Sequence, residues 1–374
     1  MFSVAAIQIV QATNENVPRA KRYENGYGWN WSSISLQDTT PLIVSQRQFT
    51  PTTTTPTTDD VYPCPPPPLV QPNFTAPGRR KSVTKCYEYI WQLKARVDKA
   101  DANKRCSKYY SDAPFVLGGR NTTPGEFPHM GAIGWKSVTG TWLFNCGGTL
   151  ISKKFVLTAG HCIKASPLDS RIADLIPKII KFGSKNLNDA YERDIGRIIP
   201  HPEYKPPRQY FDIALIELQY ELFFNKEVQP ACLWPKVDDS FGKQATITGW
   251  GLYEKGNRNT SVELQAGDLS IIDSSNCNRL LRTSSNRHWD GIMNHQLCAG
   301  KLEGGIDACQ GDSGGPLQVR IPIPAPYDKR EAQMHYVIGI TSFGIGCALP
   351  NLPGVYTRVS SFLDWIENIV WANE

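Results

Sequence analysis

Residues 116–374 predict an all-β fold, either a sandwich or a barrel. Short apolar segments rich in Val, Ile, Phe and Thr alternate there with clusters of Gly, Pro, Asn and Asp, a pattern typical of strands joined by tight turns. The region is also long enough to bury two cores. Its last segment changes period, so we expect a C-terminal helix. The apolar residues at helical spacing are Phe362, Leu363, Ile366, Ile369 and Val370.

The first 81 residues predict no packed structure. Residues 1–12 are mainly apolar, and small residues near their end have the spacing of a signal-peptidase cleavage site. They lack the basic residues that open a normal signal peptide, so we expect a weak or truncated one. Residues 13–81 hold few aliphatic side chains and are rich in Thr and Pro. Such a composition buries too little apolar surface to offset its ordering entropy. It predicts a linker, either an unmodified spacer or one that carries O-glycans.

Residues 82–115 have a different character. Between Ser82 and Cys106, apolar side chains recur at helical spacing among Lys, Arg, Glu and Gln, which predicts one amphipathic helix. We expect its apolar stripe to pack on the globular region or on a small domain of its own, and a membrane anchor is the alternative. Residues 1–115 are thus expected to be largely disordered, with one helix near their end.

Composition excludes several partners and indicates a compartment. The net charge is only +5, and no Lys/Arg block is interleaved with aromatic residues, so we expect no nucleic acid. No apolar run approaches the length of a membrane span, so we expect no membrane. Ten cysteines favour an oxidising environment. We therefore expect a secreted, extracellular protein.

The stretch 307–316, Asp-Ala-Cys-Gln-Gly-Asp-Ser-Gly-Gly-Pro, is the candidate catalytic loop. A serine hydroxyl is a weak nucleophile that needs a base and fixed donors for the oxyanion. Glycines around Ser313 allow a tight turn and a close approach of a substrate carbonyl. The expected oxyanion donors are the N–H groups of Gly311 and Ser313. By itself such a string is more often a polar turn.

Two further groups complete the candidate site. His161 follows the apolar run 155–157, and Asp212 heads the apolar run 213–216, so each lies at the end of a strand-like segment. The chain order His, Asp, Ser is one of the known orders of a catalytic triad. We therefore expect His161 to act as the base, Asp212 to orient it, and Ser313 to be the nucleophile.

Residues 116–374 resemble a chymotrypsin-fold, trypsin-like serine protease domain. Residues 125–135 are more narrowly similar to the snake-type, clip-associated proteases of insects. The resemblance implies two six-stranded antiparallel β-barrels that meet at the triad, a C-terminal helix and no cofactor. Five motifs in order carry it, namely Leu-Thr-Ala-Gly-His-Cys (157–162), Phe-Asp-Ile-Ala-Leu (211–215), Thr-Gly-Trp-Gly (248–251), Gly-Asp-Ser-Gly-Gly-Pro (311–316) and Gly-Val-Tyr-Thr-Arg-Val (354–359).

The resemblance also implies a specificity pocket. Asp307 occupies the position of the pocket base, and Gly344 and Gly354 match its walls. A carboxylate at the bottom of a narrow slot is stabilised by a long cationic side chain, so we expect cleavage after Arg or Lys, and Ala308 favours Arg. Alone, Asp307 would more often be a solvated loop carboxylate.

The segment 342–344 is implied to pair with the substrate backbone. Phe343 stands where the family usually has Trp, and Ser342 is expected to donate a hydrogen bond to Asp212. The loop 183–189 lacks the acidic pattern of the family's calcium-binding members, so we expect no metal. Sequons for N-glycosylation occur at Asn30, Asn73, Asn121 and Asn259.

The family's disulfides leave one cysteine over. The resemblance implies Cys146–Cys162, Cys277–Cys298 and Cys309–Cys347. Residues 116–374 hold seven cysteines and residues 1–115 hold three. Both numbers are odd, so a bridge from Cys232 to the N-terminal segment would leave an even number of cysteines to pair within each region. We expect Cys106–Cys232, because the ten residues to Phe115 can span up to roughly 33 Å, with Cys64–Cys86 as the remaining pair.

The resemblance implies an activation switch. Val116 matches the family's new N-terminus, whose freed amine pairs with Asp312. Burying that charge alone costs several kcal/mol, so the ion pair and the oxyanion loop should form together. Since Phe115 precedes the cut, we expect an activator that prefers large apolar residues. The alternative is cleavage elsewhere, for example at 79–81.

The sequence therefore predicts a secreted zymogen of a trypsin-like endopeptidase in an extracellular cascade of immune or developmental signalling. Its expected partners are a protein substrate such as another zymogen, an upstream activating protease and a serpin-type inhibitor. One alternative is an inactive homologue that acts as a binding cofactor, although such proteins usually lose the nucleophile or the base. A digestive trypsin is the other, although digestive enzymes need only a short propeptide.

Overall fold

A computed structural model describes residues 70–106, 122–251, 261–304, 311–323, 327, 333–344 and 349–373 of the chain. The side chains of 104–106 are not among the described ones. Several predicted features lie outside the described residues: the signal peptide, most of the linker, the Phe115–Val116 bond, the pocket base Asp307 and the Cys309–Cys347 bridge.

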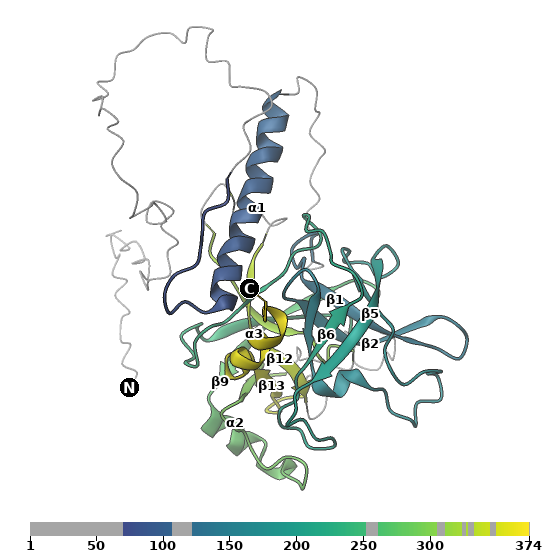
Figure 1. Cartoon of the computed structure of the whole chain (residues 1–374). Coiled ribbons are helices and arrows are strands. Elements are labelled where there is room, and N and C mark those ends of the chain that lie inside the picture. Colours follow the sequence, from purple (N-terminus) through teal and green to yellow (C-terminus); the bar gives the residue numbers. More distant parts are fainter. Residues whose placement is uncertain are drawn as a thin grey trace, which may run out of the picture. The chain divides into compact units, whose positions relative to one another are not determined.

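The first β-barrel is closed by six antiparallel strands in the order β1-β2-β3-β6-β5-β4 (Figure 1). Apolar side chains such as Ile133, Leu157 and Leu215 fill its interior and are fully buried, as the alternating pattern of the strands requires. The strands are β1 (Met130–Lys136), β2 (Trp142–Leu150), β3 (Phe155–Thr158), β4 (Ile179–Phe182), β5 (Tyr191–Pro200) and β6 (Ala214–Leu218).

The second β-barrel follows in the chain. Its sheet runs β11-β8-β9-β10-β13-β12, and pairing of β11 with β12 closes it, while the short β7 (Cys232–Leu233) adds to β12 in parallel. The predicted pair of six-stranded barrels is thereby confirmed. The strands are β8 (Gln244–Gly249), β9 (Gln265–Ile272), β10 (Gln296–Gly300), β11 (Pro316–Arg320), β12 (His335–Phe343) and β13 (Gly354–Arg358).

Short helices connect and finish the barrels. α2 (Ser274–Leu280) begins where the Asp273 carboxylate accepts a hydrogen bond from the Asn276 N–H at 2.8 Å, a typical N-cap. The predicted C-terminal helix is present as α3 (Leu363–Val370). The 3₁₀ turns are η2 (Gly160–Ile163), η3 (Arg282–Ser284) and η5 (Val359–Phe362).

The predicted N-terminal helix is present as α1 (Lys81–Cys106). Its buried face includes Cys86, Tyr89, Ile90 and Leu93, and the Tyr89 hydroxyl donates to the Ile151 carbonyl at 3.1 Å. The apolar stripe thus packs on the barrels, as the preferred interpretation expected. None of the helices in the described part of the chain combines the length and apolar character that a bilayer crossing needs.

The start of α1 and the end of α3 lie side by side and cap each other (Figure 1). The Glu367 carboxylate accepts hydrogen bonds from the Ser82 N–H at 3.1 Å and the Ser82 hydroxyl at 2.5 Å. In return, the Lys81 ammonium donates to the Trp371 carbonyl at 2.6 Å. A helix start offers unpaired N–H groups and partial positive charge, and a helix end offers the opposite. This double capping fixes α1 against the catalytic region.

The disulfide that ties α1 to the barrels is Cys86–Cys232, with the Cα atoms 5.0 Å apart. The predicted pairs Cys106–Cys232 and Cys64–Cys86 are therefore wrong. Cys106 lies 20 residues beyond Cys86 in the same helix, roughly 30 Å further along its axis. Parity correctly required a bridge to the N-terminal segment, but the direction of the helix decided which cysteine forms it. No cysteine with a described side chain is free.

The end of the predicted linker and the loop between β11 and β12 contribute to this interface. The end of the predicted linker is packed, since Phe74 is 5% exposed and its ring lies 6.1 Å from that of Tyr87. Aromatic burial here overrides the proline-rich composition. In the enlarged loop between β11 and β12, the Tyr327 hydroxyl donates to the Asp98 carboxylate at 2.8 Å. That loop therefore supports the middle of α1.

Candidate active site

Strand pairing brings His161 and Asp212 together. β3 pairs with β6 so that Thr158 faces Ala214, and η2, which contains His161, follows β3 directly. The imidazole Nδ1 lies 2.8 Å from Asp212 Oδ2, and the His161 N–H donates to Oδ1 at 2.8 Å. Both carboxylate oxygens therefore hold the histidine.

Ser342 adds a third contact, because its hydroxyl donates to Asp212 Oδ2 at 2.5 Å, as the sequence predicts. Asp212 is 4% exposed. Burial opposes its charge, but the adjacent His161 and these hydrogen bonds outweigh burial, so the pKa of Asp212 is lowered. Burial likewise opposes charge on His161, and the Asp212 carboxylate outweighs it, so the pKa of His161 is raised. The arrangement stabilises an imidazolium beside a carboxylate.

The loop of Ser313 is held against the same disulfide that flanks His161. The Ser313 carbonyl accepts from the Gly147 N–H at 2.8 Å, and the Gly314 N–H donates to the Thr341 carbonyl at 2.8 Å. Gly314 has φ 77°, and a Cβ there would lie 3.1 Å from Cys162 Sγ. Because Cys162 follows His161 in the chain, the nucleophile loop lies next to the base.

Asp312 lies in a notch that only glycines leave open. Its Oδ1 accepts from the Gly251 N–H at 2.9 Å, and a Cβ at Gly249 or Gly251 would overlap the carboxylate. Sequence analysis missed this role of the 248–251 motif, although the glycines on both sides of Trp250 were the signal. The expected partner of Asp312, the amine of Val116, lies outside the described residues.

The expected substrate-binding segment forms the edge of the second barrel. Ser342 and Phe343 end β12, Gly354 begins β13, and the two strands pair. The Phe343 ring meets Trp289 edge to face at 5.5 Å. Gly311, an expected oxyanion donor, has φ 104°, a conformation that requires glycine.

The bridges Cys146–Cys162 and Cys277–Cys298 are present. Cys146, His161 and Cys162 have nitrogen and sulfur atoms within 4.8 Å of one another. Metal ions bind thiolates, whereas these two sulfurs are joined to each other. The cluster is therefore part of the candidate catalytic centre.

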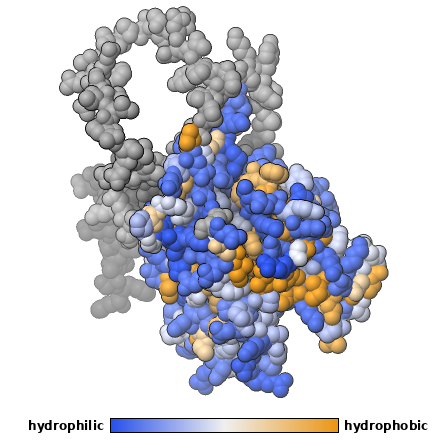
Figure 2. Space-filling model, viewed as in Figure 1, coloured by the Kyte–Doolittle hydropathy of each residue, from blue (hydrophilic) through white to orange (hydrophobic). Residues whose placement is uncertain are grey.

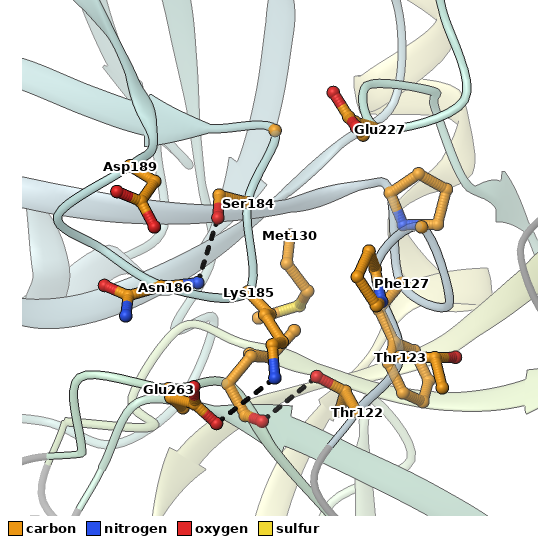
Figure 3. Close-up of a pocket in the computed structure, with 15 residues that line it drawn as sticks. Thr122, Thr123, Phe127, Met130, Ser184, Lys185, Asn186, Asp189, Glu227 and Glu263 are labelled. Atoms are coloured by element: carbon orange, nitrogen blue, oxygen red, sulfur yellow. Dashed lines mark hydrogen bonds and ion pairs between the residues drawn. The ribbon is translucent and has the colours of Figure 1, made fainter. Parts of the chain in front are cut away.

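A cavity of about 340 Å³ lies elsewhere, between the start of the catalytic region and the loop 183–189 (Figure 3). Its charged side chains are largely engaged, since Lys185 Nζ lies 3.3 Å from Glu263 Oε2. The Thr122 hydroxyl donates to the Leu264 carbonyl at 3.1 Å. None of the candidate catalytic residues lines it.

Exposed apolar side chains lie on the loop that follows His161 in the chain and on the β1–β2 turn. Most of the surface in Figure 2 is hydrophilic, with apolar side chains gathered toward one side of the view. Leu168, on the loop that follows His161, is 91% exposed. The Val138 N–H donates to the Arg171 carbonyl at 2.9 Å, so this loop is joined to the β1–β2 turn, where Val138 is also exposed.

The fold, the order of the three groups and the paired His161 and Asp212 define a chymotrypsin-type serine protease. A family profile described as Trypsin matches residues 116–366, so the chain belongs to the trypsin family.

The chain is 37% identical over 306 residues to "Serine protease snk" of Drosophila melanogaster, a match that covers 79% of this chain and 66% of that protein. It is 36% identical over 265 residues to "Serine protease Hayan" of the same fly, a match that covers 68% of this chain and 39% of that protein. It is 35% identical over 264 residues to "Clotting factor G beta subunit" of Tachypleus tridentatus, covering 68% and 80%. The resemblance to snake-type proteases is confirmed. The matches span less than two thirds of the length of each of the two fly proteins.

Proposed function

We propose that this chain is a secreted zymogen of a trypsin-like serine endopeptidase that cuts protein substrates after Arg or Lys. The observation that carries the proposal is the network in which the buried Asp212 and Ser342 hold the partly exposed His161 beside the loop of Ser313. A catalytically inactive cofactor has no need of such a network. We therefore place the inactive homologue behind this proposal. The digestive trypsin also ranks behind it, because such enzymes need only a short propeptide, whereas here a long helix is bridged to the catalytic region.

In the proposed mechanism, Ser313 Oγ attacks the scissile carbonyl and His161 Nε2 takes its proton. Asp212 holds Nδ1–H and stabilises the imidazolium. The N–H groups of Gly311 and Ser313 stabilise the oxyanion. His161 then gives the proton to the leaving amine, an acyl-enzyme remains on Ser313, and water hydrolyses it by the same steps with His161 again as the base.

Specificity is proposed to come from Asp307 at the base of a pocket whose walls are Gly344 and Gly354. A buried carboxylate without a cation is costly, so Arg and Lys side chains should bind far better than Phe. Phe343, packed on Trp289, is proposed to shape the neighbouring subsite.

Activation is proposed to cut Phe115–Val116, after which the new amine pairs with Asp312 and orders the oxyanion loop. Because Cys86–Cys232 joins α1 to the catalytic region, the prosegment should stay attached. The proposed partners are another zymogen as substrate, an apolar-specific activating protease and a serpin-type inhibitor. The relative named as a clotting factor subunit supports a role in an extracellular cascade.

The proposal is tested by treating the purified zymogen with chymotrypsin and with trypsin. Chymotrypsin should produce a chain that begins at Val116 and cleaves Arg substrates far faster than Phe substrates. Phe115→Arg should transfer activation to trypsin without changing the finished enzyme, because residue 115 stays on the prosegment side. Asp307→Ser, activated in the same way, should lose the Arg preference.

Two results would contradict this proposal. Full activity from a terminus other than Val116 would refute the switch. Equal rates on Arg and Phe substrates for the wild type would refute the pocket.

A further inference from the structure

Phe211, directly before Asp212, has a left-handed backbone with φ 54°. Only glycine adopts this conformation freely, and bulky residues in it are genuine outliers. Among the described non-glycine residues, only Phe211 and Asn351 have positive φ. Asparagine tolerates this region, whereas phenylalanine does not, so the surroundings must hold Phe211 in place.

The strained residue sets the direction of Asp212. The Ile213 N–H donates to the Phe211 carbonyl at 2.8 Å, which closes a three-residue turn with Asp212 at its centre. The Asp212 carbonyl accepts from the Thr357 hydroxyl at 2.8 Å. A rotation at Phe211 would swing the Asp212 carboxylate away from His161.

Two imidazoles enclose the Phe211 ring. The His295 ring lies 4.4 Å away with an interplanar angle of 20°, and the His201 ring lies 5.6 Å away at 11°. Phe362 closes the edge of the stack at 6.1 Å and 83°. Offset and edge-to-face aromatic contacts of this kind are favourable beyond the area they bury. The stack therefore offsets the strain at Phe211.

The backbone of each histidine is hydrogen-bonded close to the same turn. The His201 N–H donates to the Ile213 carbonyl at 3.0 Å. The His295 carbonyl accepts from the Arg358 N–H at 2.9 Å, and Arg358 follows Thr357, which binds Asp212. His201 directly follows β5 of the first barrel, and His295 directly precedes β10 of the second barrel. The stack thus joins both barrels at the base of the catalytic aspartate.

Burial favours the neutral form of both imidazoles that pack on Phe211. His201 Nδ1 accepts from the Glu203 N–H at 3.2 Å, so that nitrogen carries no proton. Burial lowers the pKa of His201 and of His295. An asparagine at 211 would suit the backbone but could not fill the space between the rings.

We propose that Phe211 is a positioning residue: its ring, held between His201 and His295, fixes the turn that aims Asp212 at His161. The inference rests on the proposed function of Asp212. Phe211 acts on the reaction only through Asp212.

The test compares Phe211→Ala, Phe211→Asn and Phe211→Tyr in the full chain, activated identically and counted by active-site titration. Phe211→Ala and Phe211→Asn should lower kcat about 10- to 100-fold, the size of effect expected from a small misplacement, with KM changed less than twofold. The acid limb of kcat/KM should move to lower pH, because Asp212 then raises the pKa of His161 less. Phe211→Tyr keeps the ring and should restore both. Phe223→Ala, at an aromatic residue that is 94% exposed, is the matched control and should change neither.

Normal kcat in Phe211→Asn would overturn the inference, because the backbone conformation alone would then suffice. A loss of active enzyme without a change in kcat or in the pH profile would also overturn it. If Phe211→Ala does not fold, His295→Ala, which removes one face of the stack, must show the same lowered kcat. A correctly cleaved wild type with no activity would instead contradict the proposed function.

Discussion

Asp212 and Glu367 are buried carboxylates at two junctions of this chain. Asp212 lies where the two barrels meet, and Glu367 lies where the start of α1 meets α3. Asp212 is 4% exposed and accepts from a histidine, a backbone N–H and a serine. Glu367 is 9% exposed and accepts from the Ser82 N–H and hydroxyl, with Arg80 at 3.3 Å. Each joins segments that are distant in the sequence.

The difference lies in the partner. Asp212 faces an imidazole whose charge changes near neutral pH, so the strength of the contact is coupled to proton transfer. Glu367 faces a backbone amide, a hydroxyl and a guanidinium that stays charged at all relevant pH values. Similar hydrogen-bond geometry therefore serves chemistry at one junction and attachment at the other.

The largest expected effect separates these roles. Asp212→Asn should lower kcat roughly 10⁴-fold, since the amide favours the wrong imidazole tautomer, while leaving α1 in place. Asp212 raises the pKa of His161, and only the neutral imidazole accepts a proton. Wild-type activity is therefore lost as pH falls through that raised pKa, and the acid limb of kcat/KM should shift to lower pH in the variant. A pH–rate series on titrated enzyme measures both quantities.

The second effect concerns the covalent tie. Cys86 and Cys232 are 146 residues apart in the chain, and removing such a bridge typically costs 2–5 kcal/mol of stability. After activation, Cys86→Ser with Cys232→Ser should give two chains that separate in denaturing gels without reductant. They should still co-elute under native conditions, because the docked face of α1 remains.

Cys106→Ser is the control for this experiment and should leave the activated chains joined. Separation of the chains in Cys106→Ser, with retention in the double variant, would contradict the Cys86–Cys232 assignment.

The smallest effect tests the other carboxylate. Glu367→Gln weakens the cap on Ser82 and should lower the free energy of unfolding by about 1.5–3 kcal/mol, the range for a hydrogen bond that involves a charged group. Its kcat and pH profile should match the wild type, unlike those of Asp212→Asn. Denaturant unfolding checks the loss of stability, and steady-state kinetics check the unchanged kcat and pH profile. An altered pH profile in Glu367→Gln would contradict the claim that Glu367 serves only to attach α1.

The predictable part of this molecule is the part whose chemistry is local. His161, Asp212 and Ser313 each lie in a short motif, and strand alternation predicts an all-β region, whereas the pair of barrels and the Ser342–Asp212 contact were expected only from the family resemblance. The partner of Cys232 could not, because it depends on the direction in which α1 leaves the barrels. The strain at Phe211 also escapes prediction, since it requires two histidines brought from different barrels.

The central claim is that Ser313 is a nucleophile activated by His161. The most direct test treats chymotrypsin-activated protein with a fluorophosphonate, which phosphonylates only activated serines with loss of fluoride, and maps the label by peptide mass. The label should lie on Ser313 in the wild type and be absent from His161→Ala and from the uncut zymogen. A correctly cleaved wild type that takes up no label, or takes it up at another residue, would contradict the account.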